Sequence, residues 1–179
     1  MQNLLKSWYV LNTRPKSERK VAELLAKKKI ECYCPVVKSE GQWLDRKKTA
    51  GEPLFASYVF VRLHENDLHY ASQTDGVSNY LFWLGKPAII RNEEIEEIRK
   101  FLSEFSDVQL EKTHVNVNDR VRLLGGPLMM RESNIMEVTS SAVKVSLPSL
   151  GYTLVAEVDR ENPGRISYLT KLQTTVNKF

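Results

Sequence analysis

The hydrophobic pattern changes once along this chain, and that change constrains the fold more than any other feature of the sequence. Up to about residue 105, apolar residues recur both at helical spacing and in short β-prone runs. After a polar stretch at 106–116, only short alternating segments remain, separated by glycine, proline and serine. We therefore expect an N-terminal domain at 1–105, a linker at 106–116 and a second domain at 117–179.

The first domain is predicted to be an α+β structure. Strands are predicted at four apolar runs, 8–11, 32–37, 57–63 and 77–84, and Pro35 favours an edge or a bulge in the second of them. Helices are predicted after Ser17, at 65–73 and from Asn92 to Phe105. This order predicts an antiparallel sheet with flanking helices.

The second domain is predicted to be a small β-barrel. Apolar and polar residues alternate strictly at 143–147 and again at 152–158, a period of two that would scatter apolar residues around a helix. Pro148 and Gly151 would also interrupt a helical hairpin in its middle. We therefore expect strands here, in the protein as it exists free in solution.

Positive charge is concentrated near the N-terminus. Residues 1–48 carry 12 Lys and Arg against 5 Asp and Glu, or +7, while residues 49–179 carry 14 against 17, or −3, which gives the net +4. Much of the excess lies on the outer face of the first predicted helix, at Lys16, Arg19, Lys20, Lys27 and Lys28. A localised basic surface suits nucleic acid or an acidic protein, although a solvated helix face explains the same charges.

No residue pattern predicts catalysis or a cofactor. Cys32 and Cys34 are two residues apart, which suits neither a relaxed disulfide nor a four-ligand zinc site, so we interpret them as small buried or half-buried residues. His64 and His69 do not share a helical face. The sequence holds neither a phosphate-binding glycine loop nor a nucleophile motif. We expect no enzyme activity, no metal and no cofactor.

The location of the protein also follows from the sequence. No run approaches the ~18 uninterrupted apolar residues of a membrane span, and the N-terminus lacks the features of a secretory signal. We expect a cytoplasmic protein without a membrane partner.

Three aromatic residues, Trp8, Phe55 and Tyr58, lie at the ends of predicted strands. Aromatic side chains are the usual anchors of protein interfaces, so these three are candidates for binding a partner. Packing in the core is the alternative, and for any single aromatic residue it is the more common outcome.

Short motifs with a family resemblance cover nearly the whole chain. They are Trp8-Tyr9-Val10, Arg14-Pro15, Glu18, Pro35, the run from Pro53 to Val61, Asp75-Gly76-Val77, 84–88, 118–122 and Gly126-Pro127-Leu128. With these motifs the chain resembles the NusG family of transcription elongation factors, which consist of an NGN domain followed by a KOW domain. The run from Pro53 to Val61 is the most specific motif, and it resembles specialised paralogues such as RfaH and the UpxY group more than housekeeping NusG.

The resemblance implies a non-catalytic factor that binds RNA polymerase. By position, Trp8, Phe55 and Tyr58 would grip the clamp helices of the largest polymerase subunit, and His69 and Tyr70 would face the gate-loop side of the channel. Holding the clamp closed would reduce pausing or termination, for specific operons in the specialised paralogues. The resemblance also implies contacts with non-template DNA from four basic residues, Arg14, Lys16, Lys20 and Lys27.

Two further expectations come from the resemblance. The KOW domain would bind a ribosomal protein or a termination factor, and the protein would be a monomer.

The alternative function is an RNA-binding or ribosome-associated module, in which the basic helix and the loop at Arg46-Lys47-Lys48 hold RNA without any polymerase.

Overall fold

The chain divides into two compact units, Met1–Asp107 and Val108–Phe179, which we name the N-terminal unit and the C-terminal unit. A computed structural model describes five stretches of them, residues 5–37, 51–105, 108–112, 136–138 and 142–157. The basic loop Arg46-Lys47-Lys48 and the first predicted strand of the second domain lie outside the described residues.

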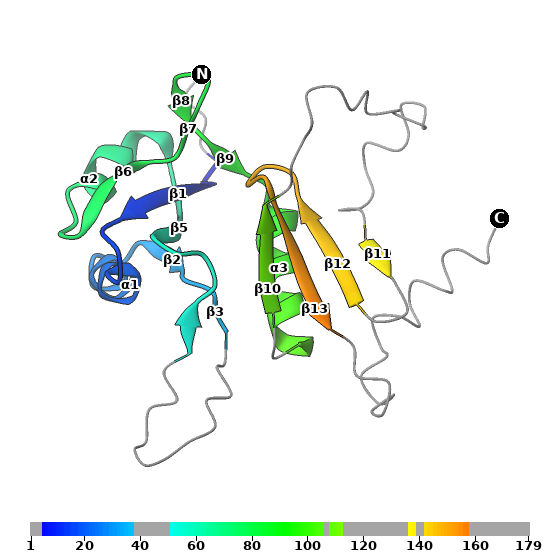
Figure 1. The fold of residues 1–179 in the computed structure, drawn as a ribbon. Helices are drawn as coiled ribbons and strands as arrows, with labels where there is room; N and C mark the ends of the chain where they lie inside the picture. The colour runs from blue at the N-terminus through cyan, green and yellow to red at the C-terminus, as the bar shows by residue number, and fades with distance from the viewer. Residues whose placement is uncertain (1–4, 38–50, 106–107, 113–135, 139–141, 158–179) are drawn as a thin grey trace, which may run out of the picture. The chain divides into compact units, whose positions relative to one another are not determined.

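An antiparallel sheet forms the centre of the N-terminal unit (Figure 1). Its strand order is β2-β5-β1-β6, and a short strand, β9, also pairs with β1. The strands are β1 (Ser7–Thr13), β2 (Glu31–Tyr33), β5 (Tyr58–Leu63), β6 (Val77–Tyr80) and β9 (Ile89–Ile90). The predicted α+β class is confirmed.

The two central strands bury their apolar runs on both faces of this sheet. Strand β1 pairs with β5 over six residues, so that Tyr9 lies opposite Val61 and Val10 opposite Phe60. Because successive side chains point to opposite faces, Tyr9 and Val61 share one face while Val10 and Phe60 share the other. Both strands therefore need helical cover on both sides, which their continuous apolar sequences predict.

Two helices cover the first face. Helix α1 (Glu18–Lys27) packs Val21 and Leu25 onto the sheet, and α2 (Leu68–Ser72), which follows the short helix η1 (Glu65–Asp67), adds Ala71. The apolar spacing of α1 follows the helical period, so the helix buries one side and keeps its lysines on the other.

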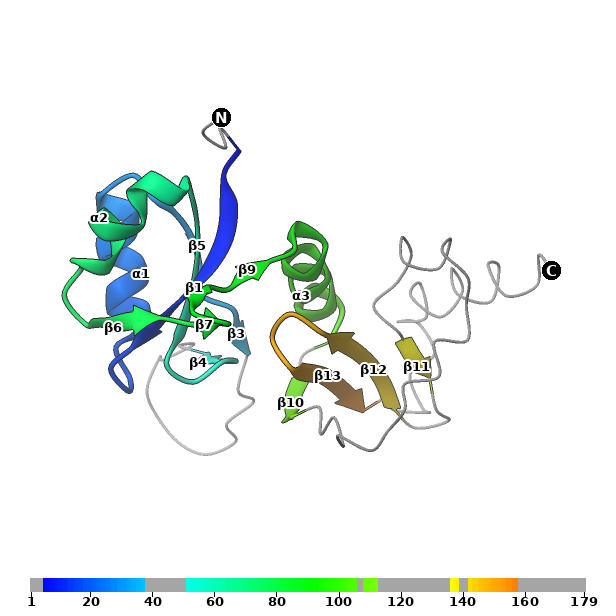
Figure 2. The ribbon, with the colours of Figure 1, turned by 90° about the horizontal axis from the view of Figure 1, so that it is seen from above.

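Helix α3 (Asn92–Glu104) packs on the opposite face, as Figure 2 shows from above. Ile95, Ile98 and Phe101 are its buried apolar residues, at helical spacing. The predicted start at Asn92 is confirmed, but the capping position is Arg91, and the Asn92 side chain accepts a hydrogen bond from the Trp8 indole instead.

Two small hairpins interrupt the predicted strands. Pro35 separates β2 from β3 (Val36–Val37), which pairs with β4 (Glu52–Pro53), as expected for a residue that lacks a backbone donor. The strand predicted at 77–84 is divided into β6 and β7 (Phe82–Trp83), and β7 pairs with β8 (Lys86–Pro87). Leu84 and Gly85 both have positive φ and form the two-residue turn between them.

The C-terminal unit contains a four-stranded antiparallel sheet of order β10-β13-β12-β11. Its strands are β10 (Val108–Lys112), β11 (Met136–Val138), β12 (Ala142–Leu147) and β13 (Tyr152–Glu157). The predicted alternation is confirmed, since Val143, Val145 and Leu147 are buried between less buried neighbours. Strand β10 lies within the stretch for which the sequence predicts a linker. The rest of the predicted barrel lies outside the described residues.

Candidate functional site

Five aromatic side chains of the N-terminal unit lie together on the α3 side of the sheet. We name this set the aromatic face, and its members are Trp8, Tyr33, Phe55, Tyr58 and Phe60. Phe60 is at its centre, with Tyr33 at 6.3 Å between ring centroids and Phe55 edge-on at 5.4 Å. Tyr58 stacks parallel to Phe55 at 6.5 Å. The structure thus brings together two of the three predicted anchors, Phe55 and Tyr58.

Trp8 joins the same face through α3. Its indole Nε1 donates a hydrogen bond of 3.2 Å to Asn92 Oδ1, and the Arg99 guanidinium lies 5.6 Å from its ring centroid. The same guanidinium lies 4.9 Å from the ring of Tyr33, so Arg99 connects two members of the aromatic face by cation–π contacts. An ion pair of 2.8 Å with Glu96 holds Arg99 from its own helix.

The predicted anchors differ in exposure. Trp8 and Phe55 are each only 2% exposed, while Tyr58 is half-buried. Burial of Trp8 and Phe55 is what core packing would produce, and Tyr58 is the most exposed of the three residues.

Phe55 and Tyr58 owe their positions to a tight turn that a buried carboxylate stabilises. Ser57 has φ of 62°, and its backbone N–H donates a 2.6 Å hydrogen bond to Glu18 Oε1. Glu18 itself is 4% exposed. The Ser57 carbonyl accepts a 2.8 Å bond from the Thr13 backbone N–H, so the turn is tied to both α1 and β1. Sequence reasoning used Glu18 only as one of the family motifs and missed this role.

His69 and Tyr70 lie on α2, on the other side of the sheet from the aromatic face. Both are exposed, and Tyr70 has 51% of its surface accessible. The Lys28 ammonium lies 4.7 Å from the Tyr70 ring centroid and donates a 2.9 Å hydrogen bond to Thr74 Oγ1. Lys28 thus connects α1 to the end of α2, and it was absent from the predicted site.

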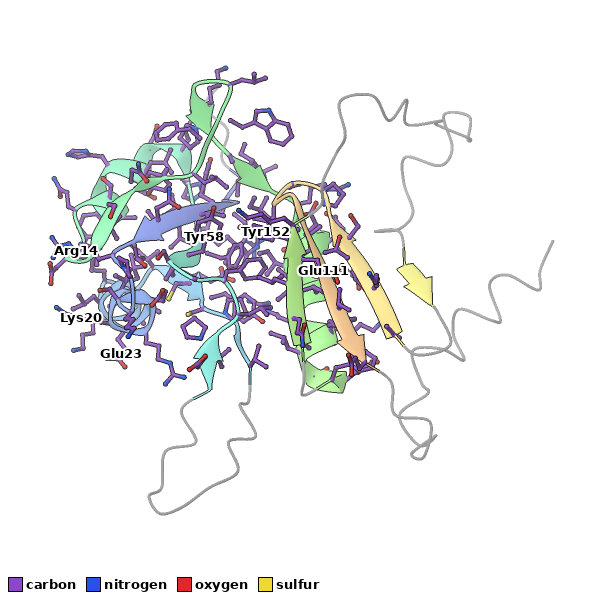
Figure 3. The ribbon with its side chains drawn as sticks, viewed as in Figure 1. Arg14, Lys20, Glu23, Tyr58, Glu111 and Tyr152 are labelled. Atoms are coloured by element: carbon purple, nitrogen blue, oxygen red, sulfur yellow. The ribbon has the colours of Figure 1, made fainter. Side chains whose placement is uncertain are left out.

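The four basic candidates lie at the start and along the outer side of α1. We name them the basic surface, and they are Arg14, Lys16, Lys20 and Lys27, all exposed. Figure 3 shows Arg14 and Lys20 projecting near Glu23 at the outer edge of the unit. Lys16, with φ of 62°, follows Pro15 in the turn that leads into the helix.

An acidic residue that sequence reasoning missed lies within the basic surface. Asp75 forms ion pairs with Lys20 at 2.8 Å and with Arg14 at 3.7 Å. The hydrogen bond from Lys20 is the largest of the influences that hold the pKa of Asp75 below its usual value. A sequence signal existed, because Asp75 directly precedes Gly76 in one of the family motifs. Its ion-pair partners Lys20 and Arg14, however, lie 55 and 61 positions earlier in the chain, and only the tertiary structure brings them together.

Neither cysteine has the properties of a reactive thiol. Both are free and half-buried. Burial raises the pKa of Cys34 to about 11, with the nearby Glu18 adding to the effect, and burial also raises the pKa of Cys32. Among the described residues, no group of three potential metal ligands gathers, and no helix there is long and apolar enough to cross a membrane.

A pocket of about 210 Å³ lies beside β1, α2 and β8. It is smaller than most small-molecule sites, which enclose roughly 300–1,000 Å³. Its lining is largely apolar, and Glu65 and Lys86 contribute the charged groups. Tyr9 belongs to this lining, and burial, with Glu65 nearby, raises the pKa of its hydroxyl. This arrangement does not present a nucleophile next to a general base.

Comparisons with known proteins identify the family. A solved structure described as "Domain interaction in Thermotoga maritima NusG" is 21% identical, with a TM-score of 0.48, and the alignment covers 86% of this chain and 93% of that one. The transcription termination/antitermination proteins NusG of Streptococcus pyogenes serotypes M3 and M1 are each 27% identical over 170 residues, 86% of this chain and 93% of theirs. The family model described as "Transcription termination factor nusG" matches residues 6–99, which is more than half of the chain. The chain therefore belongs to the NusG family of transcription termination and antitermination factors.

Proposed function

We propose that this protein binds RNA polymerase through its N-terminal unit and reduces pausing or termination. The observation that carries the proposal is the aromatic face, which is built from residues inside the stretch that the family model matches. In this proposal Trp8, Phe55 and Tyr58 contact the clamp helices of the largest polymerase subunit. His69 and Tyr70, on the other side of the sheet, contact the gate-loop side of the channel.

The proposed mechanism is binding without chemistry. A factor that contacts two sides of the channel stabilises the closed clamp by the difference between its affinities for the closed and open states. A few kcal/mol of such difference changes the populations by one to two orders of magnitude or more. Action at specific operons, as in the specialised paralogues, is part of this proposal, as are a monomeric state and a cytoplasmic location.

The test is capture of core RNA polymerase by the full-length protein in the absence of nucleic acid. Tyr58→Ala and Phe55→Ala should each weaken binding by about 2 kcal/mol or more, because a central interface aromatic contributes far more than its neighbours. The matched control is Phe82→Ala, which removes a 56% exposed ring from the β7 hairpin and should leave capture unchanged.

Circular dichroism of each variant separates binding from folding. If Phe55→Ala unfolds the N-terminal unit while Tyr58→Ala binds polymerase normally, Phe55 belongs to the core, Tyr58 is not an anchor, and the aromatic face is not the polymerase site. Retention by RNA alone, lost at moderate salt and without capture of polymerase, would favour the RNA-binding alternative.

We further propose that the basic surface contacts non-template DNA in the transcribing complex. Lys20→Glu and Lys27→Glu together should weaken association with a paused elongation complex while sparing capture of core polymerase. Lys86→Glu makes the same kind of charge change on a different hairpin and serves as the control. Equal affinity of the double variant and the wild type at every salt concentration would show that these charges form a solvated helix face.

The consequence for transcription can be measured directly. On a template that carries a terminator, the protein should raise the fraction of full-length transcript. The KOW-type C-terminal unit is proposed to bind a ribosomal protein or a termination factor, and pull-down with each purified partner tests that part separately.

A further inference from the structure

Asp75 places a carboxylate at the centre of the basic surface. Its two oxygens face different partners, Oδ2 to Lys20 Nζ at 2.8 Å and Oδ1 to Arg14 Nη1 at 3.7 Å. All three side chains are more than half exposed, so the group is accessible to a ligand from solution. Within the described residues, no ion pair involves Lys16 or Lys27, and the carboxylate therefore engages only half of the basic surface.

Backbone hydrogen bonds hold the turn around Asp75, so its carboxylate is positioned beside these cations. Arg14 donates its backbone N–H to the Gly76 carbonyl at 2.8 Å, and Val77 donates to the Thr74 carbonyl at 3.0 Å. Gly76 has φ of +91°, and a Cβ there would lie 2.8 Å from Val21 Cγ2. The turn therefore packs directly on α1, which presets Asp75 beside the first turns of that helix.

The position that Asp75 occupies is one that a phosphate would take. A carboxylate and a phosphate are both anionic oxygen acceptors, and Arg and Lys recognise them by the same charge-assisted hydrogen bonds. A phosphate that binds Arg14 and Lys20 must first displace Asp75 or accept its repulsion. An aspartate carboxyl is ionised at neutral pH, and the hydrogen bond from Lys20 lowers the pKa of Asp75 further, so this competition persists under ordinary conditions.

We propose that Asp75 competes with the phosphate groups of nucleic acid for Arg14 and Lys20. This competition lowers the affinity of the basic surface for nucleic acid that is not held by polymerase. This inference rests on the proposed nucleic-acid contact of that surface. Free DNA then competes with an intramolecular carboxylate at Arg14 and Lys20. DNA held next to the protein by polymerase has a high local concentration and displaces the carboxylate more readily.

The test is binding of the full-length protein to a labelled single-stranded DNA of mixed sequence, without polymerase, over a range of salt. Asp75→Asn should bind about two- to five-fold more tightly at low salt, the range set by the modest strength of exposed ion pairs. Its log Kd against log salt should be steeper by about one, because at least one further cation reaches a phosphate. Asp67→Asn, in η1, makes the same charge change at another exposed carboxylate and is the control.

A double-mutant cycle identifies the mechanism. In a protein that carries Arg14→Ala and Lys20→Ala, Asp75→Asn should have no larger effect than Asp67→Asn, since the competitor has lost its cations. If Asp75→Asn matches Asp67→Asn in the wild-type background as well, the inference is wrong while the basic surface still binds DNA. If Lys20→Glu with Lys27→Glu leaves DNA binding unchanged, the proposed contact itself fails and the inference falls with it.

Discussion

At the scale of single residues, the Glu18 carboxylate is one of the few buried charged groups of the N-terminal unit. It accepts a hydrogen bond from the backbone N–H of Ser57. Ser57 has positive φ, a backbone conformation that costs about 1–2 kcal/mol in any residue other than glycine. The turn at Ser57 sets the directions of Phe55 and Tyr58, so one helix residue supports two candidate anchors on the other side of the sheet.

Glu18→Ala should therefore lower the free energy of unfolding of the N-terminal unit by about 1–3 kcal/mol, because it leaves a half-buried backbone donor without its acceptor. Urea denaturation followed by tryptophan fluorescence measures this unit alone, since all three tryptophans lie within residues 1–107. Glu23→Ala, on the exposed side of the same helix, should change the free energy by no more than about 0.5 kcal/mol. Equal effects of the two changes would mean that the Ser57 contact contributes nothing.

At the scale of elements, the turn between α2 and β6 positions α1 against the sheet. Gly76 lies against α1 in this turn, and its missing side chain leaves room for Val21. The same turn carries Asp75, so the packing of two elements determines where a charge meets the basic surface. Residues 74–77 therefore connect the fold of the N-terminal unit to its proposed nucleic-acid contact.

Gly76→Ala is expected to destabilise the N-terminal unit by about 2–4 kcal/mol, which combines the strain of positive φ with overlap of the new methyl group and Val21. Gly85→Ala isolates the first contribution, because Gly85 also has positive φ, +78°, but nothing lies within 4 Å of the place that its new methyl group would take. Its effect should be about 1–2 kcal/mol. Denaturation midpoints followed by circular dichroism would contradict the packing argument if the two variants lost the same stability.

At the scale of the whole molecule, the chain is two units of different construction. The N-terminal unit buries a helix-covered sheet, and the core cluster on its α1 side comes entirely from residues 9–80. The C-terminal unit is antiparallel sheet in every described element. The excess of positive over negative charge lies in the first 48 residues. The proposed polymerase and DNA contacts belong to the N-terminal unit, and the proposed KOW partner belongs to the C-terminal unit.

This division predicts that a fragment of residues 1–107 folds cooperatively by itself, with a single denaturation transition in tryptophan fluorescence. In the full-length protein, NMR chemical shifts of residues 142–157 should have strand values. Helical values there would show that the free protein folds this region as a helical hairpin, which the strict alternation of apolar residues and Pro148 argue against. A fragment 1–107 that fails to unfold cooperatively would contradict the division into units.

The sequence by itself determined the kind of most of the described elements. Local spacing is enough for this, because helical and strand periods place apolar residues differently, as at Val21 and Leu25 or at Val143 and Val145. The sequence motifs were also sufficient to identify the family. The break at Leu81 and the strand β10 in the expected linker were missed, because a short segment becomes a strand only when a partner strand offers it hydrogen bonds.

Only the tertiary structure decided how the candidate residues are used. Trp8 and Phe55 are buried by residues far from them in the chain. The contact of Arg99 with two rings and the ion pair of Asp75 with Lys20 also connect residues that are far apart in the sequence. Periodicity says which side of an element is apolar, but it contains no information on what packs against that side. That choice depends on the summed contacts of the whole unit, which no local pattern encodes.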